Sequence, residues 1–254
     1  MLVTCVFLTA CGSGSNNESK TPAVNACGAA VTATTSSCGG AGETTVASGP
    51  TAASSALSDF GISTIPQASL TLGAPGAPLT INLYQNFLCP HCRDFALDMF
   101  PQLIADYVAT GKVDVVFHDA AFGGGPANVA HEAAHCAADQ GKFWPAYFAL
   151  YQAYSDDSAT YTNARMESAL EPIGVDNGKL ASCLESHQHL AEVEAATTAF
   201  QQLADNNAAY ASALATVTAA QGPAIPMLDV GGTYLTAPED YETVKAAIDA
   251  KLGP

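Results

Sequence analysis

The chain has 254 residues, enough for one large domain or for a domain that carries an insertion. It contains 24 Asp and Glu residues but only 8 Lys and Arg residues, so its formal net charge is -16. An acidic surface of this kind repels phosphate backbones, and we therefore expect no nucleic-acid partner. The 8 cysteines, spread along the chain, are typical of an oxidising compartment, where structural disulfides persist.

The first ten residues are almost wholly apolar and run into Leu8-Thr9-Ala10-Cys11. This run resembles the signal of bacterial lipoproteins, in which small residues precede a cysteine that is lipidated. We predict a signal peptide with a lipobox over residues 1–11, a lipid on Cys11 as membrane anchor, and an extracytoplasmic location in the cell envelope. No Lys or Arg precedes the short apolar run, so a cleaved secretory signal without lipid remains an alternative.

Residues 12–58 are rich in Ser, Thr, Ala and Gly and almost lack large apolar side chains. Such a segment cannot bury enough surface to offset the entropy of ordering it, so we predict a flexible tether. Its two cysteines, Cys27 and Cys38, either close a small local loop or are incidental.

Regular patterning begins near residue 59. Alternating apolar and polar residues predict a strand over 79–84, and helical spacing predicts a helix from Pro90 to about Thr110, which Gly111 ends. A second strand is predicted over 113–117. The sequence Cys89-Pro90-His91-Cys92 thus lies where the helix begins, inside a strand–helix–strand unit.

The rest of the chain is predicted to be helical and then to return to strands. A loop at 123–126 leads into a helical tract from about 127 to 220, broken at Gly141, at 155–160 and at Gly174. Strands at 227–230 and 233–235 flank Gly231-Gly232, a two-residue hairpin signal. A final helix is predicted over 237–252, with Pro238 near its start.

A C-x-x-C pair that opens a helix after a strand is the redox motif of the thioredoxin fold. The element order therefore predicts an α/β protein with this fold over residues 59–254. A helical domain, at about 124–220, is inserted between the βαβ unit and the C-terminal ββα unit.

The position of Cys89 favours its thiolate. The sulfur would face the unpaired N–H groups of the first helical turn and the positive end of the helix dipole. Pro90 suits the first helical position because it has no N–H to satisfy, and His91 adds a donor or a positive charge beside the sulfur. We expect no cofactor beyond the Cys89–Cys92 disulfide. A structural disulfide or half of a zinc site at this pair is disfavoured, because no second C-x-x-C exists.

Cys89-Pro90-His91-Cys92 matches the active site of the DsbA family of bacterial disulfide-forming proteins. Two further stretches resemble that family in the expected order: Ala133 to Trp144 is similar to the start of its helical insertion, and Ala224 to Gly232 is similar to its cis-proline loop and hairpin.

This resemblance implies roles for individual residues. Cys89 would be the attacking cysteine and Cys92 the resolving one, with Pro226 as a cis-proline facing the pair. The backbone of Ile225 would then pair with an extended substrate segment.

The resemblance also implies a direction and partners. A stabilised thiolate stabilises the reduced enzyme, which favours a dithiol oxidase acting on reduced exported proteins. A membrane quinone-linked oxidase of the DsbB or VKOR kind would recharge it. The alternatives are a reductase or isomerase on the same fold, a non-catalytic binding lipoprotein and, more distantly, a zinc hydrolase.

One position departs from the family. Its members usually carry a buried Glu or Asp six residues before the first cysteine, where this chain has Leu83. Asn86 is the nearest polar candidate for handling the proton.

His131-Glu132-Ala133-Ala134-His135 fits the H-E-x-x-H pattern of zinc hydrolases. The same helix continues into the DsbA-like stretch, so we expect a partly exposed helix of the insertion, and we assign no metal ligands. Glu167, His187 and His189 are loose candidates for a third ligand.

Cys136 and Cys183 both fall on predicted helices of the insertion. In some DsbA-like proteins a second disulfide staples this region, and the resemblance implies that these two cysteines form it. Buried free thiols are the alternative. The aromatic residues between 143 and 151 are predicted to form a core stripe.

Overall fold

The computed structural model describes residues 60–215 and 224–253. The predicted signal peptide, the lipidation site Cys11, the tether with Cys27 and Cys38, and the last residues of the predicted insertion lie outside the described residues. No helix in the described part of the chain is long and apolar enough to cross a membrane.

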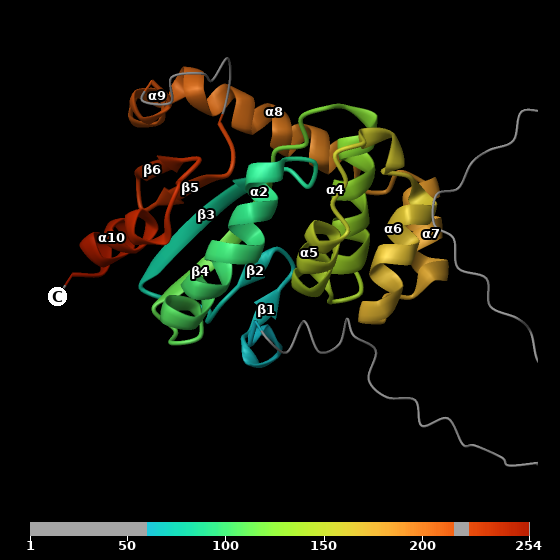
Figure 1. Ribbon diagram of the computed structural model, residues 1–254, viewed down its shortest axis with the longest axis horizontal. Coiled ribbons are helices and arrows are strands. Elements are labelled where there is room, and N and C mark those ends of the chain that lie inside the picture. The colour runs from blue at the N-terminus through green and yellow to red at the C-terminus, as the bar shows by residue number, and fades with distance from the viewer. Residues whose placement is uncertain (1–59, 216–223, 254) are drawn as a thin grey trace, which may run out of the picture. The chain divides into compact units, whose positions relative to one another are not determined.

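The fold is organised around a mixed sheet with the strand order β1-β2-β4-β3-β5-β6 (Figure 1). Strands β3 and β4 are parallel, and the other neighbouring strands are antiparallel. The strands are β1 (Gln67–Ala68), β2 (Thr71–Leu72), β3 (Leu79–Gln85), β4 (Val113–Asp119), β5 (Met227–Val230) and β6 (Thr233–Thr236). The first two were not predicted, because a two-residue strand is too short to show a period.

The central strands have the alternation that the sequence predicts. Every second residue of β3, from Leu79 to Gln85, is buried, and the same holds for β4 from Val113 to Asp119. Both strands thus bury one polar residue at their carboxyl ends, Gln85 and Asp119, and these two residues are direct partners in the parallel register.

The helical stretch after the cysteine motif changes its winding three times. It comprises α2 (Pro90–Asp94), a π-helical turn η2 (Phe95–Met99), α3 (Phe100–Leu103) and a second π-helical turn η3 (Ile104–Val108). At the first change the Phe100 N–H donates to the Phe95 carbonyl, five residues back. The next residue, Pro101, has no N–H to continue an α-helical ladder, which accounts for the wider turn before it.

Helices fill the region between β4 and β5, as predicted for the insertion. They are α4 (Gly125–Ala138), α5 (Phe143–Gln152), η4 (Ser158–Thr160), α6 (Asn163–Leu170), η5 (Glu171–Ile173), α7 (Asn177–Glu185), α8 (Leu190–Asn206) and α9 (Ala208–Leu214). A short 3₁₀ turn, η1 (Ile62–Thr64), precedes the sheet. Gly141 and Gly174 interrupt the helices with positive φ angles, as predicted. Figure 1 shows α8 running from α4 toward α9, which contacts β6.

The closing helix begins later than predicted. It is α10 (Tyr241–Leu252), and the Asp240 side chain caps it by accepting a hydrogen bond from the Thr243 N–H. The prediction of a start at 237 relied on Pro238 and overlooked this cap. Ala237 itself has a positive φ angle of 45° and cannot start a helix.

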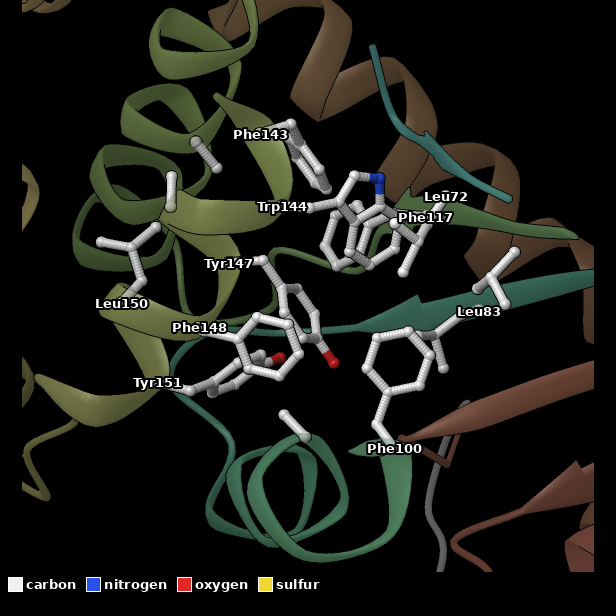
Figure 2. Packing of buried hydrophobic residues seen from close by; sticks show 14 of the residues in the cluster. Leu72, Leu83, Phe100, Phe117, Phe143, Trp144, Tyr147, Phe148, Leu150 and Tyr151 are labelled. Carbon is white, nitrogen blue, oxygen red and sulfur yellow. The ribbon is translucent and has the colours of Figure 1, made fainter. Parts of the chain in front are cut away.

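The aromatic stripe on α5 forms the centre of the core, as predicted (Figure 2). Tyr147 packs on Phe100 of α3 with 5.6 Å between ring centroids, and Phe143 packs on Phe117 of β4 at 5.1 Å. These rings therefore join the inserted helices to the sheet and to the helix that carries the cysteine motif.

Cys136 of α4 and Cys183 of α7 form a disulfide, with 6.0 Å between their Cα atoms and a sequence separation of 47. Closing a loop of this length in the unfolded chain is worth about 4 kcal/mol in the chain-entropy model, and measured effects are often smaller.

We predict that replacing both Cys136 and Cys183 by serine lowers the free energy of unfolding by about 2–4 kcal/mol and leaves the redox potential of Cys89 and Cys92 unchanged. Urea unfolding of the oxidised protein measures the first effect, and equilibration with glutathione measures the second. A change in potential would show that the second disulfide acts on the cysteine motif.

Candidate active site

Cys89 occupies the N-cap of α2. Its backbone is extended, with φ -95° and ψ 122°, and Pro90 takes the first helical position. The Cys89 carbonyl accepts the first helical hydrogen bond, from the Arg93 N–H at 3.0 Å. The helix thus begins at the motif, and the half-buried Cys89 sulfur faces the N–H groups of its first turn.

These surroundings lower the pKa of Cys89 from 9.0 to about 6. The largest contribution is a hydrogen bond from the Cys92 thiol, which outweighs the opposing effect of burial. The backbone N–H groups of Cys92 and His91 also donate to the sulfur, and the charge of His91 adds a smaller contribution. Near neutral pH the Cys89 sulfur is therefore mostly a thiolate.

Cys92 behaves in the opposite way. It is fully buried, and burial raises the pKa of its thiol well above 9.0, with the neighbouring Cys89 as the next cause. Hydrogen bonds from the Asn86 N–H and the Tyr151 hydroxyl to the Cys92 sulfur lower its pKa, but by less than burial raises it. The two cysteines thus differ in protonation, one accessible and ionised, the other enclosed and protonated.

A buried hydrogen-bonded chain supports the turn that holds Cys92. Gln85 of β3 donates from Nε2 to the Cys92 carbonyl at 3.3 Å, and its Oε1 accepts from the Tyr147 hydroxyl at 2.6 Å. Gln85 and Tyr147 are both fully buried. Buried polar groups need such partners, so this chain ties α2 to β3 and α5 in one arrangement.

The cis-proline loop lies against the motif. The Ile225–Pro226 peptide bond is cis, and the Ile225 carbonyl oxygen lies 3.9 Å from the Cys89 sulfur. Pro226 is buried while Ile225 and Cys89 are half-buried, so the reactive sulfur borders the backbone of the bend that leads into β5. Pro90 and His91 are exposed beside it.

Asn86 does not present a free side chain to the cysteines. Its Nδ2 donates to the Phe122 carbonyl at 2.7 Å, and its Oδ1 accepts from the Leu88 N–H at 3.0 Å. The hypothesis that its side chain handles the proton in place of an acid at Leu83 is therefore not supported. Asn86 affects Cys92 through its backbone N–H, whose hydrogen bond lowers the pKa of the Cys92 thiol.

The H-E-x-x-H pattern is buried, and the expectation of a partly exposed helix is wrong. His131 is fully buried, and its Nδ1 lies 2.6 Å from one oxygen of Asp119. His135 Nε2 lies 2.9 Å from the other oxygen. The glutamate of the pattern, Glu132, pairs with His187 at 3.1 Å. The two histidines thus share a carboxylate, and the glutamate is not poised over a metal-bound water.

Three residues that shape the site, Gln85, Asp119 and Tyr151, were not singled out from the sequence. The sequence could have pointed to Gln85 and Asp119. Each is a polar residue at a strand position where the alternation of buried and exposed residues predicts a buried side chain. Tyr151 looks like any core aromatic, and only the packing of α5 brings its hydroxyl near Cys92.

We predict that Cys92→Ala raises the pKa of Cys89 toward 9.0, because it removes the largest stabilising hydrogen bond. His91→Ala is the matched comparison and should raise it less, since the backbone N–H remains. The ultraviolet absorbance of the thiolate, followed against pH, measures both values. An unchanged midpoint in Cys92→Ala would contradict this account of the thiolate.

The comparisons with known proteins agree with this geometry. The chain is 30% identical over 90 residues to a Bacillus anthracis protein named "Probable disulfide bond formation protein D", a match over 35% of this chain and 42% of that one. It thus spans less than half of this curated relative.

Two crystal structures share the fold. BdbD from Bacillus subtilis matches with a TM-score of 0.58 and 20% identity, over 74% of this chain and 96% of that one. DsbA from Chlamydia trachomatis matches with a TM-score of 0.59 and 18% identity, over 74% and 93%. A family profile described as thioredoxin matches residues 66–250. The chain therefore belongs to the thioredoxin family, and its insertion is of the kind found in the DsbA structures.

Proposed function

We propose that this protein is an exported dithiol oxidase that introduces disulfides into other exported proteins through Cys89 and Cys92. The observation that carries the proposal is the opposite ionisation of the two cysteines. The pKa of Cys89 is lowered to about 6, whereas that of Cys92 is raised, so that its thiol stays protonated. The match to a disulfide bond formation protein supports the same class of reaction.

The proposed reaction begins from the Cys89–Cys92 disulfide. A substrate thiolate attacks the Cys89 sulfur, the Cys89–Cys92 bond breaks, and Cys92 leaves and takes up a proton. A second substrate thiolate then attacks the substrate sulfur of the mixed disulfide and displaces Cys89 as a thiolate. The substrate is oxidised by two electrons, and the enzyme is left as the dithiol.

The two pKa shifts favour this direction. Cys89 is a good leaving group because its thiolate is stable. Cys92 seldom attacks the mixed disulfide and reverses the first step, because its buried thiol is protonated.

The loop at Ile225 and Pro226 is the proposed docking site for substrate. It places the Ile225 carbonyl next to the Cys89 sulfur, where a substrate strand could pair with the backbone. Recharging is assigned to a membrane quinone-linked oxidase of the DsbB or VKOR kind. The Cys89 thiolate attacks the disulfide of that oxidase, and Cys92, once it has lost its proton, attacks the Cys89 sulfur of the mixed disulfide and releases the oxidase as a dithiol.

We predict that the oxidised protein forms a disulfide in a reduced two-cysteine test protein, and that Cys89→Ser and Cys92→Ser abolish this. The double Cys136→Ser, Cys183→Ser variant is the control and should remain active. The redox potential should lie nearer about -120 mV, as in DsbA, than about -270 mV, as in thioredoxin. A thioredoxin-like potential with reduction of insulin would identify a reductase instead.

The proposed anchor is a lipid on Cys11. Expressed in a bacterial host, the protein should appear in the membrane fraction and Cys11→Ser in the soluble envelope fraction. Equal partitioning of the two would refute lipidation and leave the redox proposal intact.

A further inference from the structure

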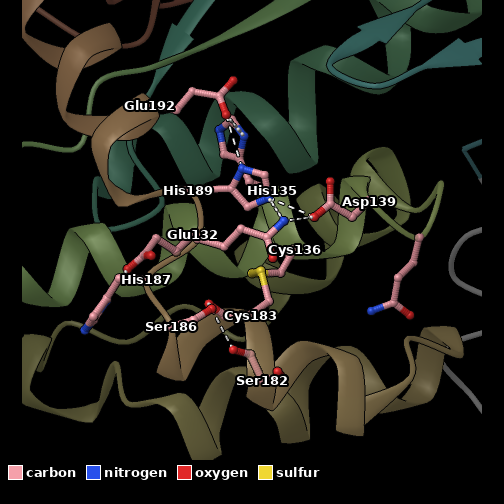
Figure 3. Close-up of a disulfide and its surroundings, with 12 residues drawn as sticks. Glu132, His135, Cys136, Asp139, Ser182, Cys183, Ser186, His187, His189 and Glu192 are labelled. Carbon is pink, nitrogen blue, oxygen red and sulfur yellow. Dashed lines mark hydrogen bonds and ion pairs between the residues drawn. A yellow bond between two sulfur atoms is a disulfide. The ribbon is translucent and has the colours of Figure 1, made fainter.

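A second cluster of ionisable side chains lies away from the cysteine motif, next to the Cys136–Cys183 disulfide (Figure 3). It is formed by His135 from α4, with His189 and Glu192 from the start of α8. One ligand atom from each of the three lies within 4.8 Å of the others. The side chain of His135 is only 4% exposed, that of His189 is 15% exposed, and that of Glu192 reaches solvent at 59%.

The hydrogen bonds of His135 orient its ring. Its Nε2 lies 2.9 Å from an oxygen of the buried Asp119 carboxylate and donates to it. Nδ1 is then the ring nitrogen that faces Glu192.

His189 has the same arrangement. Its Nε2 lies 2.9 Å from a carboxylate oxygen of Asp139, and Nδ1 is the ring nitrogen that faces Glu192. His189 Nδ1 lies 3.1 Å from Glu192 Oε2, and His135 Nδ1 lies 3.7 Å from the same oxygen. Two imidazole nitrogens and a carboxylate oxygen therefore converge, which is a set of ligand atoms that a divalent metal ion accepts.

Among the described residues, the Lys and Arg ion pairs are Arg93–Asp94 and Lys245–Asp249, both on other elements, so no Lys or Arg side chain pairs with Glu192. The distance of 3.7 Å between His135 Nδ1 and Glu192 Oε2 is too long for a hydrogen bond but suits two ligands of one ion. A metal ion between the three atoms would satisfy all of them.

We propose that His135, His189 and Glu192 bind a divalent transition-metal ion of the zinc class. Bonds of about 2.0–2.2 Å to a tetrahedral ion place ligand atoms about 3.3–3.6 Å apart, close to the two spacings observed here. Asp119 and Asp139 hold the outer nitrogens of the two histidines, the orientation that metal-bound imidazoles require.

This site is distinct from the H-E-x-x-H pattern. It uses His135 but not His131, whose two ring nitrogens already contact Asp119 and the Phe87 N–H. His189 was only a loose candidate for a third ligand beside His131 and His135, and Glu192 was no candidate. His135 and His189 are 54 positions apart in the chain and meet where α4 and α8 pack together. The ion would fasten the first turn of α8 to α4, beside the disulfide that fastens α7 to it.

Zinc titration of the oxidised full chain tests the site. Remaining thiols are first alkylated, so that neither Cys89 nor Cys92 can bind the metal, and bound metal is removed with a chelator. Calorimetry with zinc chloride should then show one equivalent bound, and the melting temperature should rise with zinc concentration. His189→Ala and Glu192→Gln should each weaken binding at least tenfold.

His187→Ala is the matched control and should bind zinc like the parent protein, because His187 pairs with Glu132 outside the cluster. Glu192 is largely exposed, so its variant should fold normally. Cobalt in place of zinc should give visible bands without thiolate charge-transfer absorbance. The proposal would be wrong if zinc did not bind, or if His187→Ala and His189→Ala weakened zinc binding equally. It would also be wrong if the cobalt spectrum showed thiolate charge-transfer absorbance. None of these results bears on the oxidase proposal.

Discussion

The hydrogen bond from the Cys92 thiol to the Cys89 sulfur is the interaction on which the proposed chemistry depends. It makes the largest contribution to the stability of the Cys89 thiolate, and it keeps the proton on Cys92, which is already disfavoured as an anion by complete burial. Both effects follow from one helix start: Pro90 begins α2, so that one cysteine caps the helix while the other lies a turn inside it, against the core. The difference in ionisation is therefore a property of the fold around the motif as well as of the motif itself.

Two buried polar residues at the ends of parallel strands hold that arrangement in place. Gln85 and Asp119 face each other in register, and each sends its side chain to a different helix. Gln85 supports the turn at Cys92 and reaches Tyr147 of α5, whereas Asp119 holds both histidines of α4. Since an unsatisfied polar group in such a place is costly, these bonds fix how the inserted helices sit on the sheet. The redox pair and the proposed metal site are thus both supported from the carboxyl ends of the two central strands, β3 and β4.

Much of this could be predicted from the sequence. The order of elements, the breaks at Gly141 and Gly174, and the position of the motif at a helix start follow from local patterns, which act over a few residues. The start of α10 was predicted too early, because Pro238 was taken as its first turn and the Asp240 cap was overlooked. Strands β1 and β2 were missed because two residues are too few to show a period. The burial of His131 and His135 could not be predicted, because it depends on Asp119 from a different element. The same holds for the meeting of His135, His189 and Glu192, since no local pattern encodes contacts between α4 and α8.

The difference in unfolding free energy between the reduced and the oxidised protein, measured against pH, tests the central claim most directly. Cys89 is an acid whose pKa falls from 9.0 to about 6 in the folded protein. Its contribution to the stability of the reduced form is therefore complete above pH 9.0 and is lost as the pH falls through about 6. Groups such as Asp119 and His135 titrate in both forms and cancel in the difference. The reduced protein should gain stability relative to the oxidised protein from about pH 6 to pH 9, and a difference that does not change with pH would contradict the account.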